Sequence, residues 1–107
     1  MEQQPYTLAR WLVRSGQEDA FVAAWNELAA YFLGLRQPPR WGMLLRSVDE
    51  PRLFYSFGPW PSLETIASMR ADPRTPDAMA RLTELCEAAD PGTFLVAAAA
   101  GEAPLPG

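Results

Sequence analysis

The sequence contains no histidine and no lysine, and its nine basic residues are all arginine. Without histidine the chain has no imidazole base, no Ser/His nucleophile pair and no imidazole ligand for a metal or haem. Without lysine it cannot form a Schiff base through a side chain. The glycine-rich GxGxxG phosphate loop is also missing. We therefore expect no metal, flavin or haem cofactor.

Cysteine is equally scarce. The single Cys86 cannot form a disulfide within the chain, and a zinc cluster would need more ligands. It follows Leu82 and Leu85 in a helical pattern, with Glu84 and Glu87 beside it. Acidic neighbours disfavour a reactive thiolate, so we interpret Cys86 as a small buried hydrophobic residue.

The charge balance argues against binding to nucleic acid, and the lengths of the apolar runs argue against a membrane span. Thirteen acidic residues against nine scattered arginines give a net charge of −4, which does not suit a nucleic-acid surface. The longest strongly apolar runs are too short to span a membrane. The N-terminal residues lack the basic and apolar regions of a signal peptide, so we expect a cytoplasmic protein.

A length of 107 residues suits one domain, which we place at residues 6–100, followed by a flexible tail at 101–107. Aromatic and β-branched runs predict strands, apolar residues at helical spacing predict helices, and Gly, Pro and Asp mark the turns. The expected strands are 6–13, 41–48, 52–57 and 93–100, and the expected helices are 17–35, 63–71 and 76–89, with Ser62 capping the second helix and a turn at 90–92.

This order of elements, βαββαβ with a broken second helix, predicts an α+β, ferredoxin-like fold. Its helices cover one face of a four-stranded antiparallel sheet. Both side-chain parities of the strands are substantially apolar, as in Tyr6, Leu8 and Trp11, so the other face would expose a large apolar surface. We therefore expect a homodimer that packs through the sheet face.

Three segments resemble antibiotic biosynthesis monooxygenase (ABM) domains. Residues 16–25 (GQEDAFVAAW) resemble the start of the first helix of that family, and residues 44–51 (LLRSVDEP) resemble its hairpin. Residues 57–62 (FGPWPS) resemble the end of its third strand and the start of the following helix, which has an anchor near Met69. The order and spacing extend the resemblance over about residues 6–100.

The resemblance implies a dimeric α+β barrel with a small pocket between the helices and the sheet of each subunit. Some members oxidise phenolic or quinol-like substrates with molecular oxygen and no metal or flavin, and others degrade haem. Haem-degrading members use an Asn on the first strand, a Trp in the second helix and a His after it. Ala9 and Met69 stand at the first two positions here, and the chain has no histidine. Haem degradation is therefore not expected.

A cofactor-free oxygenase must bind an electron-rich aromatic compound, stabilise its anion and exclude water. Arginine suits the anion, Tyr and Asn can donate to a phenolate, and aromatic rings form walls. The expected catalytic residues are Arg46, Arg10, Asn26 and Tyr55, and the expected substrate-binding residues are Trp60, Tyr31, Trp11, Trp41 and Met69.

Each of these residues also has a structural interpretation. Trp60 could close the corner between strand and helix, Trp11 and Trp41 could lie in the core or the dimer interface, and the arginines could form ion pairs. Two functions therefore stay open: an oxygenase of a small aromatic substrate, or a non-catalytic dimer that binds a small ligand or serves assembly. Several polar side chains converging on the pocket would favour the enzyme.

Overall fold

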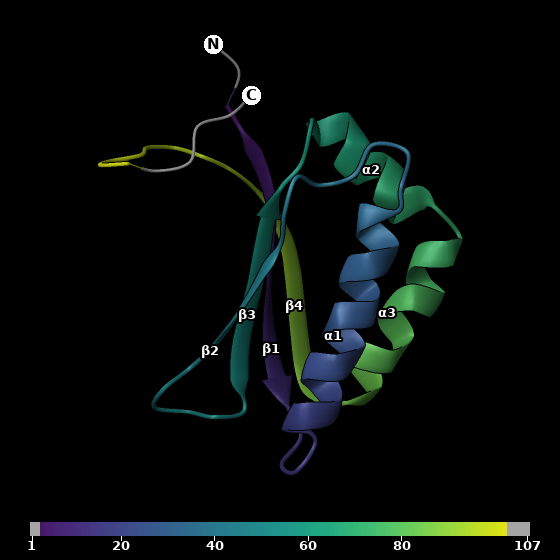
Figure 1. Ribbon diagram of the computed structural model, residues 1–107, viewed down its shortest axis with the longest axis vertical. Coiled ribbons are helices and arrows are strands. Elements are labelled where there is room, and N and C mark those ends of the chain that lie inside the picture. Colours follow the sequence, from purple (N-terminus) through teal and green to yellow (C-terminus); the bar gives the residue numbers. More distant parts are fainter. Residues whose placement is uncertain (1–2, 103–107) are drawn as a thin grey trace.

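The computed structural model of the protein describes residues 3–102 and has two layers, a four-stranded antiparallel sheet and three helices (Figure 1). All three helices lie on one face of the sheet, and the described chain leaves the other face bare (Figure 1). The elements are β1 (Pro5–Val13), α1 (Glu18–Leu33), β2 (Met43–Arg46), β3 (Leu53–Pro59), α2 (Leu63–Ala71), α3 (Arg74–Glu84) and β4 (Cys86–Leu95).

The strand order is β2-β3-β1-β4, so β1 lies in the middle of the sheet beside β3 and β4. This order and the βαββααβ succession confirm the predicted ferredoxin-like α+β fold. Of the tail expected at 101–107, residues 103–107 lie outside the described residues.

The last strand is the main correction to the predicted elements. The sequence predicts a helix to residue 89, a turn at 90–92 and a strand at 93–100, whereas α3 ends at Glu84 and β4 spans Cys86–Leu95. Asp90, Pro91 and Gly92 lie within that strand, opposite Arg10, Ala9 and Leu8. β4 is an edge strand, where a proline nitrogen can face away from the ladder without losing a hydrogen bond. Turn-forming residues are therefore tolerated there.

The second helix begins as the sequence predicts. The Ser62 hydroxyl accepts a hydrogen bond from the Thr65 backbone N–H at 3.1 Å, and the Thr65 hydroxyl accepts one from the Ser62 N–H at 3.1 Å. Threonine thus completes a capping box in which Glu or Gln is more usual.

The main core lies between α1 and the half of the sheet that contains the end of β1 and the start of β3. Phe21 of α1 contacts Trp11 of β1 at 5.5 Å and Phe54 of β3 at 5.1 Å between ring centroids. A second cluster, Trp60 with Ile66 and Met69, fixes α2 against the end of β3. Cys86 belongs to the first cluster, and burial raises the pKa of its thiol to about 11, in agreement with a structural role.

Candidate functional site

A cavity of about 420 Å³ lies between the helices and the half of the sheet that contains the start of β1 and the end of β3. It exists because the helix-facing side chains there are small: Thr7 and Ala9 on β1, and Ser56 and Gly58 directly opposite them on β3. Further along the same faces the residues become large, and Trp11 and Phe54 fill the space. A volume of this size suits a small organic molecule.

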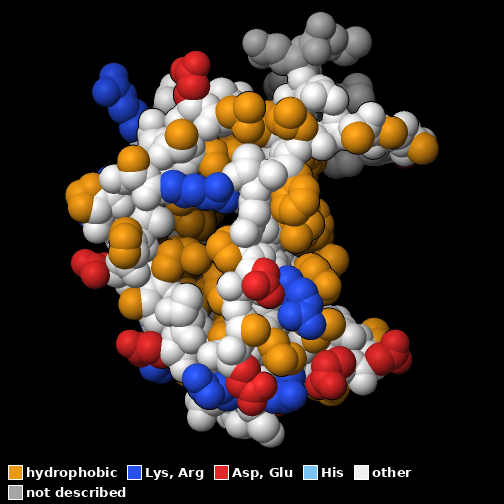
Figure 2. Space-filling view, turned by 180° about the vertical axis from the view of Figure 1, so that it is seen from behind, with side chains coloured by type: hydrophobic (Ala, Val, Ile, Leu, Met, Phe, Trp, Pro, Cys, Tyr) orange, Lys and Arg blue, Asp and Glu red, His pale blue; other side chains and the backbone are white. Residues whose placement is uncertain are grey.

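The walls of the cavity are mainly aromatic and aliphatic. All four tryptophans of the chain line it, together with Phe32 and two methionines. Figure 2 shows the hollow between helices and sheet lined by hydrophobic side chains, with a basic side chain along its edge. Flat aromatic ligands match such walls because rings pack well against rings.

Two hydroxyl groups face this cavity from the sheet, and each is oriented by an indole. The Trp60 Nε1–H donates to Thr7 Oγ1 at 2.9 Å, and the Trp11 Nε1–H donates to Ser56 Oγ at 2.9 Å. Within residues 3–102 neither hydroxyl donates its own proton to another group. Since the indole takes one acceptor position, each O–H remains available to donate to a ligand.

A third hydroxyl holds the junction of α2 and α3. Thr75 Oγ1 donates to the Met69 carbonyl at 2.7 Å, so its contact with the Tyr31 hydroxyl at 2.9 Å has tyrosine as the donor. Arg74 lies over the Tyr31 ring and pairs with Asp72 at 2.7 Å. The hydrogen bond from Arg74 lowers the pKa of Asp72 to about 2. This network keeps Met69 and Thr75 at the cavity wall.

The structure places four of the five predicted substrate-binding residues at the cavity: Trp11, Trp41, Trp60 and Met69. The fifth, Tyr31, is bonded to the lining residue Thr75. Trp60 is 2% exposed and contacts Phe32 edge-on at 5.5 Å, so it serves both as a cavity wall and as the packing of the β3–α2 corner.

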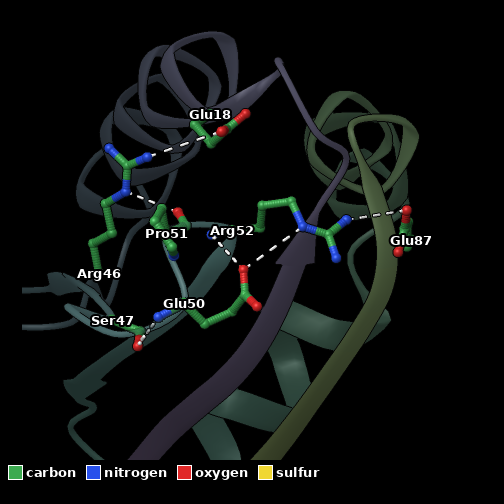
Figure 3. A network of polar contacts seen from close by, with 7 residues as sticks. All are labelled: Glu18, Arg46, Ser47, Glu50, Pro51, Arg52 and Glu87. Carbon is green, nitrogen blue, oxygen red and sulfur yellow. Dashed lines mark hydrogen bonds and ion pairs between the residues drawn. The ribbon is translucent and has the colours of Figure 1, made fainter.

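The four predicted catalytic residues do not line this cavity. Arg46 donates from Nε to the Pro51 carbonyl at 2.8 Å and lies 4.0 Å from Glu18, within a polar network at the opposite end of the sheet (Figure 3). Arg10 pairs with Asp90 at 3.8 Å, and Tyr55 is exposed opposite Arg10 on the bare face of the sheet. Asn26 is exposed on α1. Their catalytic role stays a prediction that the cavity does not support.

Sequence reasoning missed Thr7, Ser56 and Arg70, the polar residues that do line the cavity with Thr75. The signal for the first was present, because Thr7 shares its strand parity with Trp11 and therefore its sheet face. The exposed face of β3 carries Tyr55, which places Ser56 on the helix-facing side. The prediction favoured aromatic and charged side chains for the site, so the small hydroxyl residues Thr7 and Ser56 were not selected.

Comparison with solved structures identifies the fold. SnoaB from Streptomyces nogalater, a cofactor-independent oxygenase, superimposes in a variant form with a TM-score of 0.82 at 22% identity, covering 94% of this chain and 100% of SnoaB. A proposed antibiotic biosynthesis monooxygenase from Bordetella bronchiseptica gives 0.78 at 17% identity, covering 92% and 100%. The chain shares the fold of these two proteins.

A second ABM-type neighbour, a proposed antibiotic biosynthesis monooxygenase from Chloroflexus aurantiacus, gives a TM-score of 0.69 at 19% identity and covers 92% of this chain and 97% of its own. No protein-family model matches the sequence, and no curated protein matches it. The ABM resemblance of the sequence is therefore supported at the level of the fold.

Residues 3–102 contain neither a membrane-spanning helix nor a cluster of side chains suited to a metal ion. No helix in this part of the chain is long and apolar enough to cross a membrane. Within the same residues, no group of three or more Cys, Asp or Glu side chains is arranged to hold a metal ion.

Proposed function

We propose that the protein is a cofactor-independent monooxygenase of a small phenolic or quinol-like aromatic compound. The observation that carries the proposal is an aromatic cavity whose sheet side presents two indole-oriented hydroxyls, Thr7 and Ser56. A bound phenol would lie between the rings with its oxygen toward these donors. Hydrogen bonds to that oxygen favour its anion over the neutral phenol.

In this reaction the substrate supplies the electrons. The two hydrogens of one ring methylene, present in the keto tautomer of the phenol, are replaced by a carbonyl oxygen. One atom of O₂ enters the product, and the other leaves as water with those two hydrogens. The carbon loses four electrons and O₂ gains four, so no external reductant is needed. The protein contributes binding, exclusion of water and stabilisation of the developing anion.

The described residues that line the cavity include no general base. Among these residues, none carries a carboxylate, imidazole, thiol or amine, and the guanidinium of Arg70 does not deprotonate. The phenolic proton must therefore leave to water, and the fraction of ionised substrate sets the rate.

Oxygen uptake with a dihydroxyanthracene or quinol tests this proposal. We expect uptake above the spontaneous rate, rising with pH through the substrate's own pKa. A substituent that lowers the pKa of the phenol should move the midpoint of the pH profile downward by the same amount. A midpoint that stays fixed across substrates would instead reveal a titrating protein group.

The same measurement distinguishes the proposed oxygenase from the second function, a non-catalytic dimer that binds small ligands. If the parent protein consumes no oxygen above the spontaneous rate but still binds the aromatic compound, the binding protein becomes the better account.

We further propose that the protein acts as a homodimer through the bare face of the sheet. This face exposes Met43, Leu45, Tyr55 and Phe94, which are 39–51% exposed in the single chain. A partner with the same apolar face would remove these side chains from water. Sedimentation at micromolar concentration should give twice the chain mass of 11.9 kDa. A single species at the chain mass would contradict the dimer.

A further inference from the structure

Arg70 stands apart from the other lining residues because it alone carries a charge. It lies in the last turn of α2, directly after Met69, whose side chain is buried against Trp60 and Ile66. On α2, Met69 therefore packs into the second core cluster, whereas the next residue, Arg70, is exposed and lines the cavity.

The guanidinium of Arg70 has no partner within residues 3–102. Arg10, Arg52 and Arg74 pair with Asp90, Glu87 and Asp72. The exposed Arg36 and Arg81 also have no acidic partner within residues 3–102, but neither of them lines the cavity. No Asp or Glu is among the described residues that line the cavity, so this lining does not neutralise the positive charge. An unpaired guanidinium beside an apolar cavity is a binding group for an anion, preferably a carboxylate, whose two oxygens match its paired N–H groups.

We propose that Arg70 is a specificity-determining residue that selects aromatic ligands carrying a carboxylate. The ligand is then recognised at two places: its phenolic oxygen by Thr7 and Ser56 on the sheet, and its acidic substituent by Arg70 on α2. This inference rests on the proposed function for the phenolic end of the ligand. Recognition of the acidic end by Arg70 is a binding property alone, so the affinity can be measured without turnover.

The test compares a hydroxynaphthoic acid with its methyl ester, which keeps the ring and the phenol but removes the charge. All four tryptophans line the cavity, so quenching of tryptophan fluorescence reports binding directly. At about pH 6 the carboxylate is ionised and the phenol is not, which separates the two sources of negative charge. We expect the parent protein to bind the acid about tenfold more tightly than the ester.

The Arg70→Gln variant should lose this preference and bind acid and ester equally, with the affinity for the ester unchanged. Arg81→Gln is the matched control, because Arg81 is exposed on α3, does not line the cavity and carries the same charge. It should keep the full preference. Arg70→Lys should keep part of it, since the charge remains but the paired donors are lost.

Equal binding of acid and ester by the parent protein would overturn the inference, as would an unchanged preference in Arg70→Gln or no binding of either compound. Oxygen uptake distinguishes a failure of the Arg70 inference from a failure of the proposed function. Uptake with a neutral quinol and no preference for acids leaves the oxygenase without this role of Arg70. A preference for acids without uptake keeps the role of Arg70 in a protein that only binds.

Discussion

Replacing Thr7 with valine or Ser56 with alanine is expected to lower turnover by about 10²–10³, the usual loss when one preorganised donor to a developing oxyanion is removed. Both hydroxyls are held by an indole N–H at 2.9 Å and keep a free proton for the substrate. Steady-state oxygen uptake measures the effect. The loss should fall on kcat, because the hydrogen bonds strengthen as the phenol becomes an anion.

Two variants of the same residue types control for stability and for unspecific loss of a hydroxyl. Thr93→Val lies on β4 opposite Thr7, and Ser68→Ala lies on α2, and both residues are exposed and outside the cavity lining. Both should keep the turnover of the parent. Full turnover in Thr7→Val and Ser56→Ala together, with folding intact, would remove these hydroxyls from the reaction. Loss of turnover in Arg46→Gln or Asn26→Ala would return the catalytic role to the residues that the sequence favoured.

Replacing Trp60 with alanine is expected to lower the free energy of unfolding by about 3–5 kcal/mol, the range for deleting a large buried aromatic side chain. Trp60 is 2% exposed, contacts Phe32, Ile66 and Met69, and donates to Thr7. Urea unfolding monitored by circular dichroism gives the value. Trp60→Phe keeps most of the packing and loses the hydrogen bond, which should cost about 1 kcal/mol.

Trp41→Ala provides the comparison for Trp60→Ala because it deletes the same side chain from a partly exposed position. Trp41 contacts Tyr6 at 6.1 Å and Phe57 at 5.8 Å edge-on and belongs to neither buried cluster. Its removal should cost clearly less than that of Trp60. Equal losses in the two variants would contradict the assignment of Trp60 as the residue that fixes the β3–α2 corner.

The sequence predicts the fold well where the hydrophobic periodicity agrees with the local capping and turn residues. Phe21 and Leu28 are buried on α1 with Trp25 partly buried beside them, and Ser62 caps the start of α2 as expected. The prediction is wrong at β4 because Asp90, Pro91 and Gly92 have strong turn preferences. Their place in the strand is decided by long-range pairing with β1, and local propensity does not register that pairing.

The aromatic part of the candidate site was predictable, but its polar part was not. Trp11 and Trp60 line the cavity as expected, whereas Arg10 and Arg46 satisfy their charges with Asp90 and Glu18 elsewhere. Which arginine pairs and which stays free depends on distances across the fold. Arg70 has no partner within residues 3–102, and no acid is among the residues of this part of the chain that line the cavity.

Isotopically labelled oxygen gas gives the most direct test of the central claim, that this cavity lets an aromatic substrate react with O₂ without a cofactor. The measurement uses chelator-treated protein, a dihydroxyanthracene substrate and mass spectrometry of the product. The account predicts one labelled oxygen atom per product, formed faster than in buffer, and a rate that falls in Ser56→Ala. Product formation at the buffer rate, or activity that disappears with the chelator and returns with a metal, would contradict it.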